Sequence, residues 1–146
     1  MGKFLTNIED IKNNIKWIDI FDLQIIGMPN EQKLNEAQGL IKYSHIFGGF
    51  SESVRDIGFG DNNDIFVTFS DWDKGKTLSL VDDEALSKGM RLVLGDRDGS
   101  LVAKYEFSEC KLVSKVPIIF GYDNNYIIKQ TPHILVFKYS NIYKVI

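Results

Sequence analysis

Two histidines and one cysteine are the residues of this sequence best suited to acid–base or nucleophilic chemistry. His45 and His133 are far apart in the chain, and no histidine adjoins Cys110. A catalytic cysteine needs a base within hydrogen-bonding reach, and no serine occupies a nucleophile elbow. Each histidine alternates with apolar neighbours, which favours a hydrogen-bonded position in or beside the core. We expect no catalytic residue, although folding could still gather these three side chains with carboxylates in one cleft.

Acidic and amide side chains cluster at three predicted turns, where their oxygens could bind a cation. The segment Asp96–Ser100 is similar to part of a calcium loop. With Gly99 at the invariant glycine position, Leu94 would be the first ligand and Tyr105 the bidentate acid, so the loop fails at both ends. The other clusters are Asp61–Asp64 and Asp123–Asn125. Since Asn and Asp favour turns by tolerating left-handed backbone, we expect turns here and neither a metal site nor a cofactor site.

Two further patterns are typical of nucleic-acid or nucleotide binding. The glycines of the segment 48–60 lack the spacing and the Lys-Ser or Lys-Thr pair of a phosphate-binding loop, so we expect turns between strands. Six aromatic residues near the C-terminus could form a stacking platform: Phe120, Tyr122, Tyr126, Phe137, Tyr139 and Tyr143. Such platforms accompany a basic groove, and only four lysines lie near them. Core packing and subunit contacts account for these aromatic residues more simply.

The composition is that of an ordinary globular protein. The chain has 146 residues, 44% of them hydrophobic and 25% charged, with a net charge of −3. We expect one domain spanning residues 1–146, because a chain of this length can bury a sufficient hydrophobic core without disulfides or structural metals. A single cysteine excludes an intramolecular disulfide framework and a cysteine-rich zinc site. The opening MGKFLTNIED has neither a secretion signal nor a membrane span, and we read its formal match to a myristoylation motif as packing residues.

The N-terminal half begins with a helix signal. Thr6 and Glu9 have the spacing of a capping box, and isoleucines recur at helical spacing, which predicts a helix over Asn7–Ile15. This helix either docks on its own sheet or packs on a neighbouring subunit. The apolar run Lys16–Met28 predicts the first long strand. Glu31–Gln38 fits a short helix or a loop, and Leu40–Phe47 fits a strand.

Alternation and turn residues place the middle elements. We expect turns over Gly48–Asp64, a strand over Ile65–Ser70, and a further short strand over Thr77–Val81. Acids at the start and a lysine before a glycine at the end predict a short helix over Asp82–Gly89. A hairpin should then join Arg91–Leu94 to the following strand around the turn Gly95–Gly99.

The stretch Leu101–Val145 carries the strongest pattern. In Leu101–Phe107, odd-numbered apolar residues alternate with Val102, Lys104 and Glu106. The last segment, HILVFKYSNIYKV, alternates in the same way and reads as one closing strand. Period-2 patterning with aromatic and β-branched residues is the strand signal. The sequence therefore predicts a mainly β fold, a sandwich or closed barrel of about six to eight strands with one or two short helices.

The order of four segments in this stretch resembles the C-terminal half of contractile-tail tube proteins, which include the phage tail tube subunit and the tubes of related injection machines. The segments are DRDGSLVAKYEF, a strand beginning CKLVS, IIFGYDNNYII and ILVFKYSNIYKV. The resemblance covers Gly95 to Val145, about a third of the chain, and is a pattern rather than a signature. The family often has proline where Leu112 stands, and the N-terminal half is only loosely like the family's opening strands.

This resemblance implies a structural virion protein without enzymatic activity, made in the host cytoplasm and assembled into the tail. Subunits would form rings, usually hexameric, whose strands pair edge to edge around a DNA-conducting lumen. Partners would be copies of the same chain, sheath and baseplate proteins, and DNA that passes without specific binding. The acidic balance suits such a lumen, because carboxylates repel phosphates.

Other functions remain open from the sequence. A tail terminator, a baseplate adaptor or the baseplate-proximal initiator of the tube would share the resemblance. A monomeric β-barrel that binds a small ligand would have a defined apolar pocket. A small enzyme would gather His45, His133 or Cys110 with carboxylates in one cleft.

Overall fold

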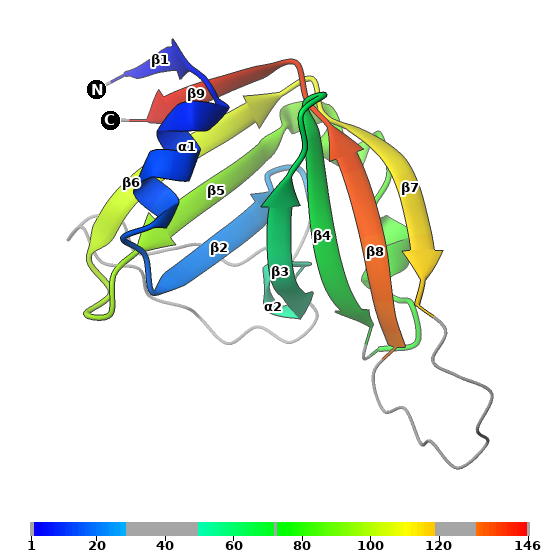
Figure 1. Cartoon of the computed structure of the whole chain (residues 1–146). Helices are drawn as coiled ribbons and strands as arrows, with labels where there is room; N and C mark the ends of the chain where they lie inside the picture. Colours follow the sequence, from blue (N-terminus) through cyan, green and yellow to red (C-terminus); the bar gives the residue numbers. More distant parts are fainter. Residues whose placement is uncertain (1, 29–49, 72, 119–130, 146) are drawn as a thin grey trace.

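The computed structural model describes residues 2–28, 50–71, 73–118 and 131–145 (Figure 1). The elements expected over Glu31–Gln38 and Leu40–Phe47, together with His45 and the turn Asp123–Asn125, lie outside the described residues.

The described residues form nine strands, two α-helices and two 3-10 turns. The strands are β1 (Lys3–Thr6), β2 (Ile20–Ile25), β3 (Val54–Phe59), β4 (Asp64–Asp71), β5 (Met90–Gly95), β6 (Leu101–Ser108), β7 (Lys111–Pro117), β8 (Thr131–Lys138) and β9 (Asn141–Val145). The helices are α1 (Ile8–Ile15) and α2 (Phe50–Ser53), and the 3-10 turns are η1 (Leu78–Leu80) and η2 (Ala85–Lys88). The mainly β prediction is confirmed, with one strand more than the upper end of the expected range.

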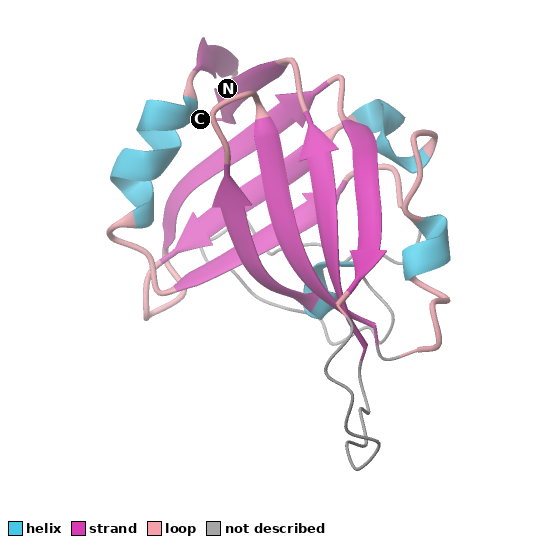
Figure 2. Cartoon of the chain, turned by 45° about the vertical axis from the view of Figure 1, so that its right-hand side comes forward, coloured by secondary structure: helices cyan, strands magenta, loops and turns pink. Residues whose placement is uncertain are grey.

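These strands form two antiparallel sheets packed as a sandwich (Figure 2). The five-stranded sheet has the order β1-β9-β6-β5-β2, and the four-stranded sheet has the order β3-β4-β8-β7. Inward side chains of both sheets make one core, because alternate residues of each strand face the other sheet. Phe107 of β6 packs against Tyr139 at 5.1 Å and against Phe59 of β3 at 6.1 Å between ring centres, which joins the two layers.

The N-terminal helix covers the part of the five-stranded sheet that the second sheet leaves uncovered (Figure 1). Ile11 of α1 is fully buried in the core, so the predicted helix docks on its own sheet. Its N-cap is Asn7, whose side-chain oxygen accepts from the Glu9 amide at 3.0 Å. The expected cap at Thr6 is wrong, because Thr6 ends β1 and pairs with Ile142 of β9.

The closing segment is two strands, and the prediction of one strand is wrong. The Tyr139 amide donates to the Asn63 carbonyl of the four-stranded sheet, whereas the next amide, that of Ser140, donates to the Ser108 carbonyl of the five-stranded sheet. β8 and β9 therefore belong to different sheets, and the inward positions change from odd-numbered residues up to Tyr139 to the even-numbered Ile142 across the break.

Three middle predictions also differ from the structure. Thr77–Val81 contains the 3-10 turn η1 in place of a strand, because the Asp73 carboxylate accepts from the Thr77 amide and hydroxyl and holds a turn. The region Gly48–Asp64, expected to be turns, contains α2 and β3. A β-bulge between Val54 and Asp56 interrupts the alternation of β3. Asp82–Gly89 forms only the short 3-10 turn η2.

The remaining predictions of strands in the described residues are confirmed with shifted ends. The Lys16–Met28 run contains β2, and Ile65–Ser70 lies within β4. The hairpin around Gly95–Gly99 is β5 paired with β6. Within the C-terminal third, β6, β8 and β9 lie inside the sheets, and β7 is at a sheet edge.

Candidate functional site

The outward face of the four-stranded sheet carries large apolar side chains where an antiparallel sheet usually presents polar ones. The strand register places Phe66 of β4 beside Val136 of β8, and Ile134 of β8 beside Val116 of β7. Phe66 and Ile134 are each 42% exposed, and Val116 is 54% exposed. We call these four residues, Phe66, Val116, Ile134 and Val136, the apolar face.

The direction of these side chains follows from the strand period. Ile65 and Val67 of β4 and Leu135 and Phe137 of β8 are fully buried between the sheets. Because successive side chains of a strand leave opposite faces, the residues between them must point outward. Burial of one side of each strand thus forces Phe66, Ile134 and Val136 toward solvent.

Charged groups lie at the border of the apolar face. Lys138 Nζ lies 2.9 Å from Asp64 Oδ1 in the row next to Phe66 and Val136. Asp56 is exposed on β3, at one end of the row that contains Ile134. An apolar centre with a polar border is the usual anatomy of a protein interface. Single apolar residues scattered on a surface are common, whereas a contiguous apolar patch is a candidate contact surface.

The outward face of the five-stranded sheet is more polar. One row crosses all five strands and consists of Leu5, Tyr143, Glu106, Arg91 and Gln24. Lys3 Nζ lies 3.7 Å from Glu106 Oε1 and 5.4 Å from the centre of the Tyr143 ring. The two outward faces of the sandwich therefore differ in chemistry.

Asp22 of β2 is a buried carboxylate on this second face. Asp22 and Gln24 are 2% and 3% exposed, and Gln24 Nε2 donates to Asp22 Oδ2 at 2.6 Å. Burial raises the pKa of Asp22, and the hydrogen bond from Gln24 opposes that shift. Arg91 Nη1 lies 3.5 Å from Gln24 Oε1 on the neighbouring strand. We interpret these three side chains as a polar link between β2 and β5.

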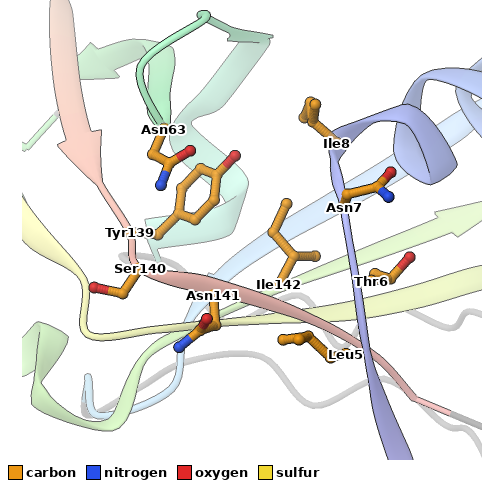
Figure 3. A pocket seen from close by; sticks show the side chains of 9 residues that line it. All are labelled: Leu5, Thr6, Asn7, Ile8, Asn63, Tyr139, Ser140, Asn141 and Ile142. Carbon is orange, nitrogen blue, oxygen red and sulfur yellow. The ribbon is translucent and has the colours of Figure 1, made fainter.

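A cleft of 220 Å³ lies between the start of α1 and the ends of both sheets (Figure 3). Its lining is uncharged: Leu5, Thr6, Asn7, Ile8, Asn63, Tyr139, Ser140, Asn141 and Ile142. Asn7 is already engaged as the cap of α1, and Tyr139 is buried against Phe107. The cleft brings no acid, base or thiol together, so it offers no chemistry of bond making or breaking.

The structure does not bring His133 and Cys110 together. Cys110 directly precedes β7, whereas His133 pairs with Pro117 at the far end of that strand, about 20 Å away by the rise of an extended chain. The Cys110 thiol is buried, and burial raises its pKa to about 11. A thiol that stays protonated is a poor nucleophile.

The turn that resembles part of a calcium loop uses its oxygens internally. Asp96 Oδ1 accepts from the amides of Asp98 and Ser100, each at 3.0 Å, which closes the hairpin between β5 and β6. Across residues 2–28, 50–71, 73–118 and 131–145, no three His, Cys, Asp or Glu side chains are placed to hold a metal ion. The same residues contain no helix long and apolar enough to cross a membrane.

Comparison with protein-family models, with curated proteins and with solved structures finds no match to this chain.

Sequence reasoning did not single out the apolar face. The signal was present, because Phe66 occupies the outward phase of β4, and Ile134 and Val136 occupy that of β8. In β4, however, Phe66 stands among polar outward residues, and only β8 has two large apolar residues, Ile134 and Val136, at successive outward positions. The structure buries only one side within the described residues.

Proposed function

We propose that this chain is a self-assembling structural subunit of a contractile-tail tube. The observation that carries the proposal is the apolar face, on which Phe66 and Ile134 each keep 42% of their surface exposed. A surface of this kind is stabilised when another protein covers it, by roughly 25 cal/mol for each Å² of apolar area removed from water. A second copy of the same chain is the simplest partner, because it is present wherever the protein itself is present.

The form of the assembly is taken from the resemblance of Gly95–Val145 to tube proteins. Rings, usually hexameric, would stack into a hollow tube that conducts DNA, beside sheath and baseplate proteins. The baseplate-proximal initiator and the tail terminator are roles within the same assembly. The sandwich of two antiparallel sheets is compatible with a structural role.

The experiment measures mass against concentration. Size-exclusion chromatography with light scattering should give a mass that rises with protein concentration, and negative-stain imaging should then find rings or tubes. Ile134→Lys places a charge in the centre of the apolar face and should abolish the rings and tubes. Leu101→Lys is the matched control, because Leu101 is 40% exposed on β6, away from that face, and this variant should assemble normally.

A monomer at every concentration would refute the proposal and favour a small-ligand-binding protein. Normal assembly of Ile134→Lys would show that the apolar face is not the contact between copies.

A further inference from the structure

The edges of the two sheets differ in how well they are closed to another strand. On β7, the Asp83 carboxylate accepts from the Leu112 amide at 3.0 Å, Pro117 has no amide hydrogen, and a β-bulge separates Leu112 from Ser114. Side-chain caps, prolines and bulges all hinder the addition of a further strand. The β7 edge is therefore guarded at several points.

The β3 and β2 edges are closed in other ways. On β3, the Ile57 amide donates to Asp56 Oδ1 at 2.9 Å, next to the bulge that precedes Asp56. On β2, the four residues Asp22–Ile25 are all buried. Each of these strands thus carries a feature that hinders the addition of a further strand.

The β1 edge lacks these devices within the described part of the chain. The sequence Lys-Phe-Leu-Thr contains no proline, and β1 pairs with β9 over Lys3–Thr6 without a bulge. Phe4 is 47% exposed and Leu5 is 64% exposed. A lysine can protect an edge, but the Lys3 ammonium lies over the outward face of its own sheet, near Glu106 and Tyr143.

We propose that β1 is a docking edge for β1 of a second copy, with the two strands antiparallel about a twofold axis. The five-stranded sheets of the two copies would join into one ten-stranded sheet. The backbone groups of β1 and the exposed Phe4 and Leu5 would be covered by identical groups of the partner. This contact involves neither the apolar face nor a ring, and it does not depend on the proposed tube.

The register of this pairing follows from the position where α1 begins. Twofold pairing keeps side chains on their own faces only when one residue lies on the axis opposite itself. With Leu5 on the axis, pairing would run through Asn7, whose backbone is extended, and would bring the partner's chain against the first turn of α1, which begins at Ile8. With Phe4 on the axis, pairing uses residues 2–6, and Lys3 lies opposite the partner's Leu5.

Charge favours an identical partner at this edge. The cations nearest to it are paired within each copy: Lys3 Nζ lies 3.7 Å from Glu106 Oε1, and Lys144 Nζ lies 3.2 Å from Asp10 Oδ2. Within the described residues, these two lysines therefore bring no unpaired positive charge into the contact. A contact of this length buries far less than the roughly 1,000 Å² of a stable interface, so we expect a weak dimer that is best detected by covalent capture.

Single cysteines placed along β1 test the contact and its register. Phe4→Cys should form a disulfide-linked dimer under mild oxidation, because residues on the axis come within disulfide distance. Lys3 and Leu5 are at least as exposed as Phe4, but both lie off the axis. We therefore expect Lys3→Cys and Leu5→Cys to link at least tenfold more slowly than Phe4→Cys. The native Cys110 is buried, so the unmodified chain serves as the blank.

The experiment is carried out both in the natural chain and in the Ile134→Lys background. Linking at Phe4→Cys in both backgrounds supports the β1 contact, whatever the result for rings or tubes. Absence of the linked dimer, or equal rates at positions 3, 4 and 5, overturns it without bearing on the tube. Phe59→Cys on β3 and Lys115→Cys on β7 should not link, since both edges are guarded.

Discussion

Tyr105 joins the N-terminal helix to the five-stranded sheet through polar groups. Its hydroxyl donates to Asp10 Oδ2 at 2.7 Å and accepts from Asn14 Nδ2 at 2.6 Å, and Lys144 Nζ lies 3.2 Å from the same Asp10 oxygen. The hydrogen bond from Tyr105, helped by Lys144, lowers the pKa of Asp10 against the opposing effect of burial. Burial and Asp10 together raise the pKa of Tyr105, so its hydroxyl remains a donor.

Replacing Tyr105 with phenylalanine should lower the free energy of unfolding by about 1–2 kcal/mol, because it removes a bond to a carboxylate that is partly screened by solvent. The folded pKa of Asp10 lies below the reference value of 3.8. Stability from this carboxylate is therefore complete above pH 3.8 and is lost as the pH falls through the folded pKa. The difference in unfolding free energy between Tyr105→Phe and the natural protein, measured by urea denaturation, should therefore shrink as the pH falls below 3.8.

Glu9→Gln is the control for this series. Glu9 and Lys12 form an exposed ion pair on the same helix, with Glu9 Oε1 3.8 Å from Lys12 Nζ, and such pairs contribute at most about 0.5 kcal/mol. A cost from Tyr105→Phe no larger than that of Glu9→Gln would contradict a linking role for Tyr105.

At the scale of elements, two glycines in different surroundings show how tightly the strands are joined. Gly89 links η2 to β5 with φ of +89°, and a Cβ added there would collide with the Phe107 carbonyl oxygen of β6. Gly58 lies on β3, and a Cβ added there would meet nothing within 4 Å. The first glycine is needed for the backbone approach, whereas the second is not needed by the isolated fold.

Gly89→Ala should cost about 3 kcal/mol of unfolding free energy, because it adds both a clash and a strained backbone. Gly58→Ala should be neutral or stabilise the fold by up to about 1 kcal/mol, since it restricts the unfolded chain and touches no neighbour. Urea denaturation of both variants measures the difference. Similar costs at the two positions would mean that the backbone around Gly89 relaxes freely.

For the whole molecule, charge sets the expected behaviour toward DNA. The net charge is −3, and the outward faces of the two sheets carry acids beside their lysines, as in the pairs Lys138–Asp64 and Lys3–Glu106. Binding of duplex DNA without sequence preference requires a surface that neutralises several phosphates. Four lysines of the described surface lie in ion pairs, which leaves them less available to phosphates: Lys3, Lys12, Lys138 and Lys144.

We therefore expect no retardation of double-stranded DNA in a gel at protein concentrations up to about 10 µM in physiological salt. A titration at low salt is the comparison, because any electrostatic binding strengthens steeply there. A complex that persists in physiological salt would indicate a nucleic-acid-binding role and would count against a DNA-conducting lumen.

The sequence by itself determined which segments of the C-terminal third are extended and which side chains of β6 and β8 share a face. Period-2 alternation is a local property, so Tyr105 and Phe107, or Leu135 and Phe137, could be assigned to one face without knowing their partners. The helix α1 was also predictable, because its apolar spacing and polar start lie within a few residues.

Only the tertiary structure decided which sheet each strand joins and which faces stay open. The assignment of β8 and β9 to different sheets depends on the carbonyls that the Tyr139 and Ser140 amides reach, and these belong to residues far away in the sequence. The exposure of Phe66 and Ile134 was not predicted from the sequence, because an apolar side chain has the same local pattern whether or not a layer covers it. Exposure is set by what packs against a face, and for that reason the apolar face appears only when the strands are assembled.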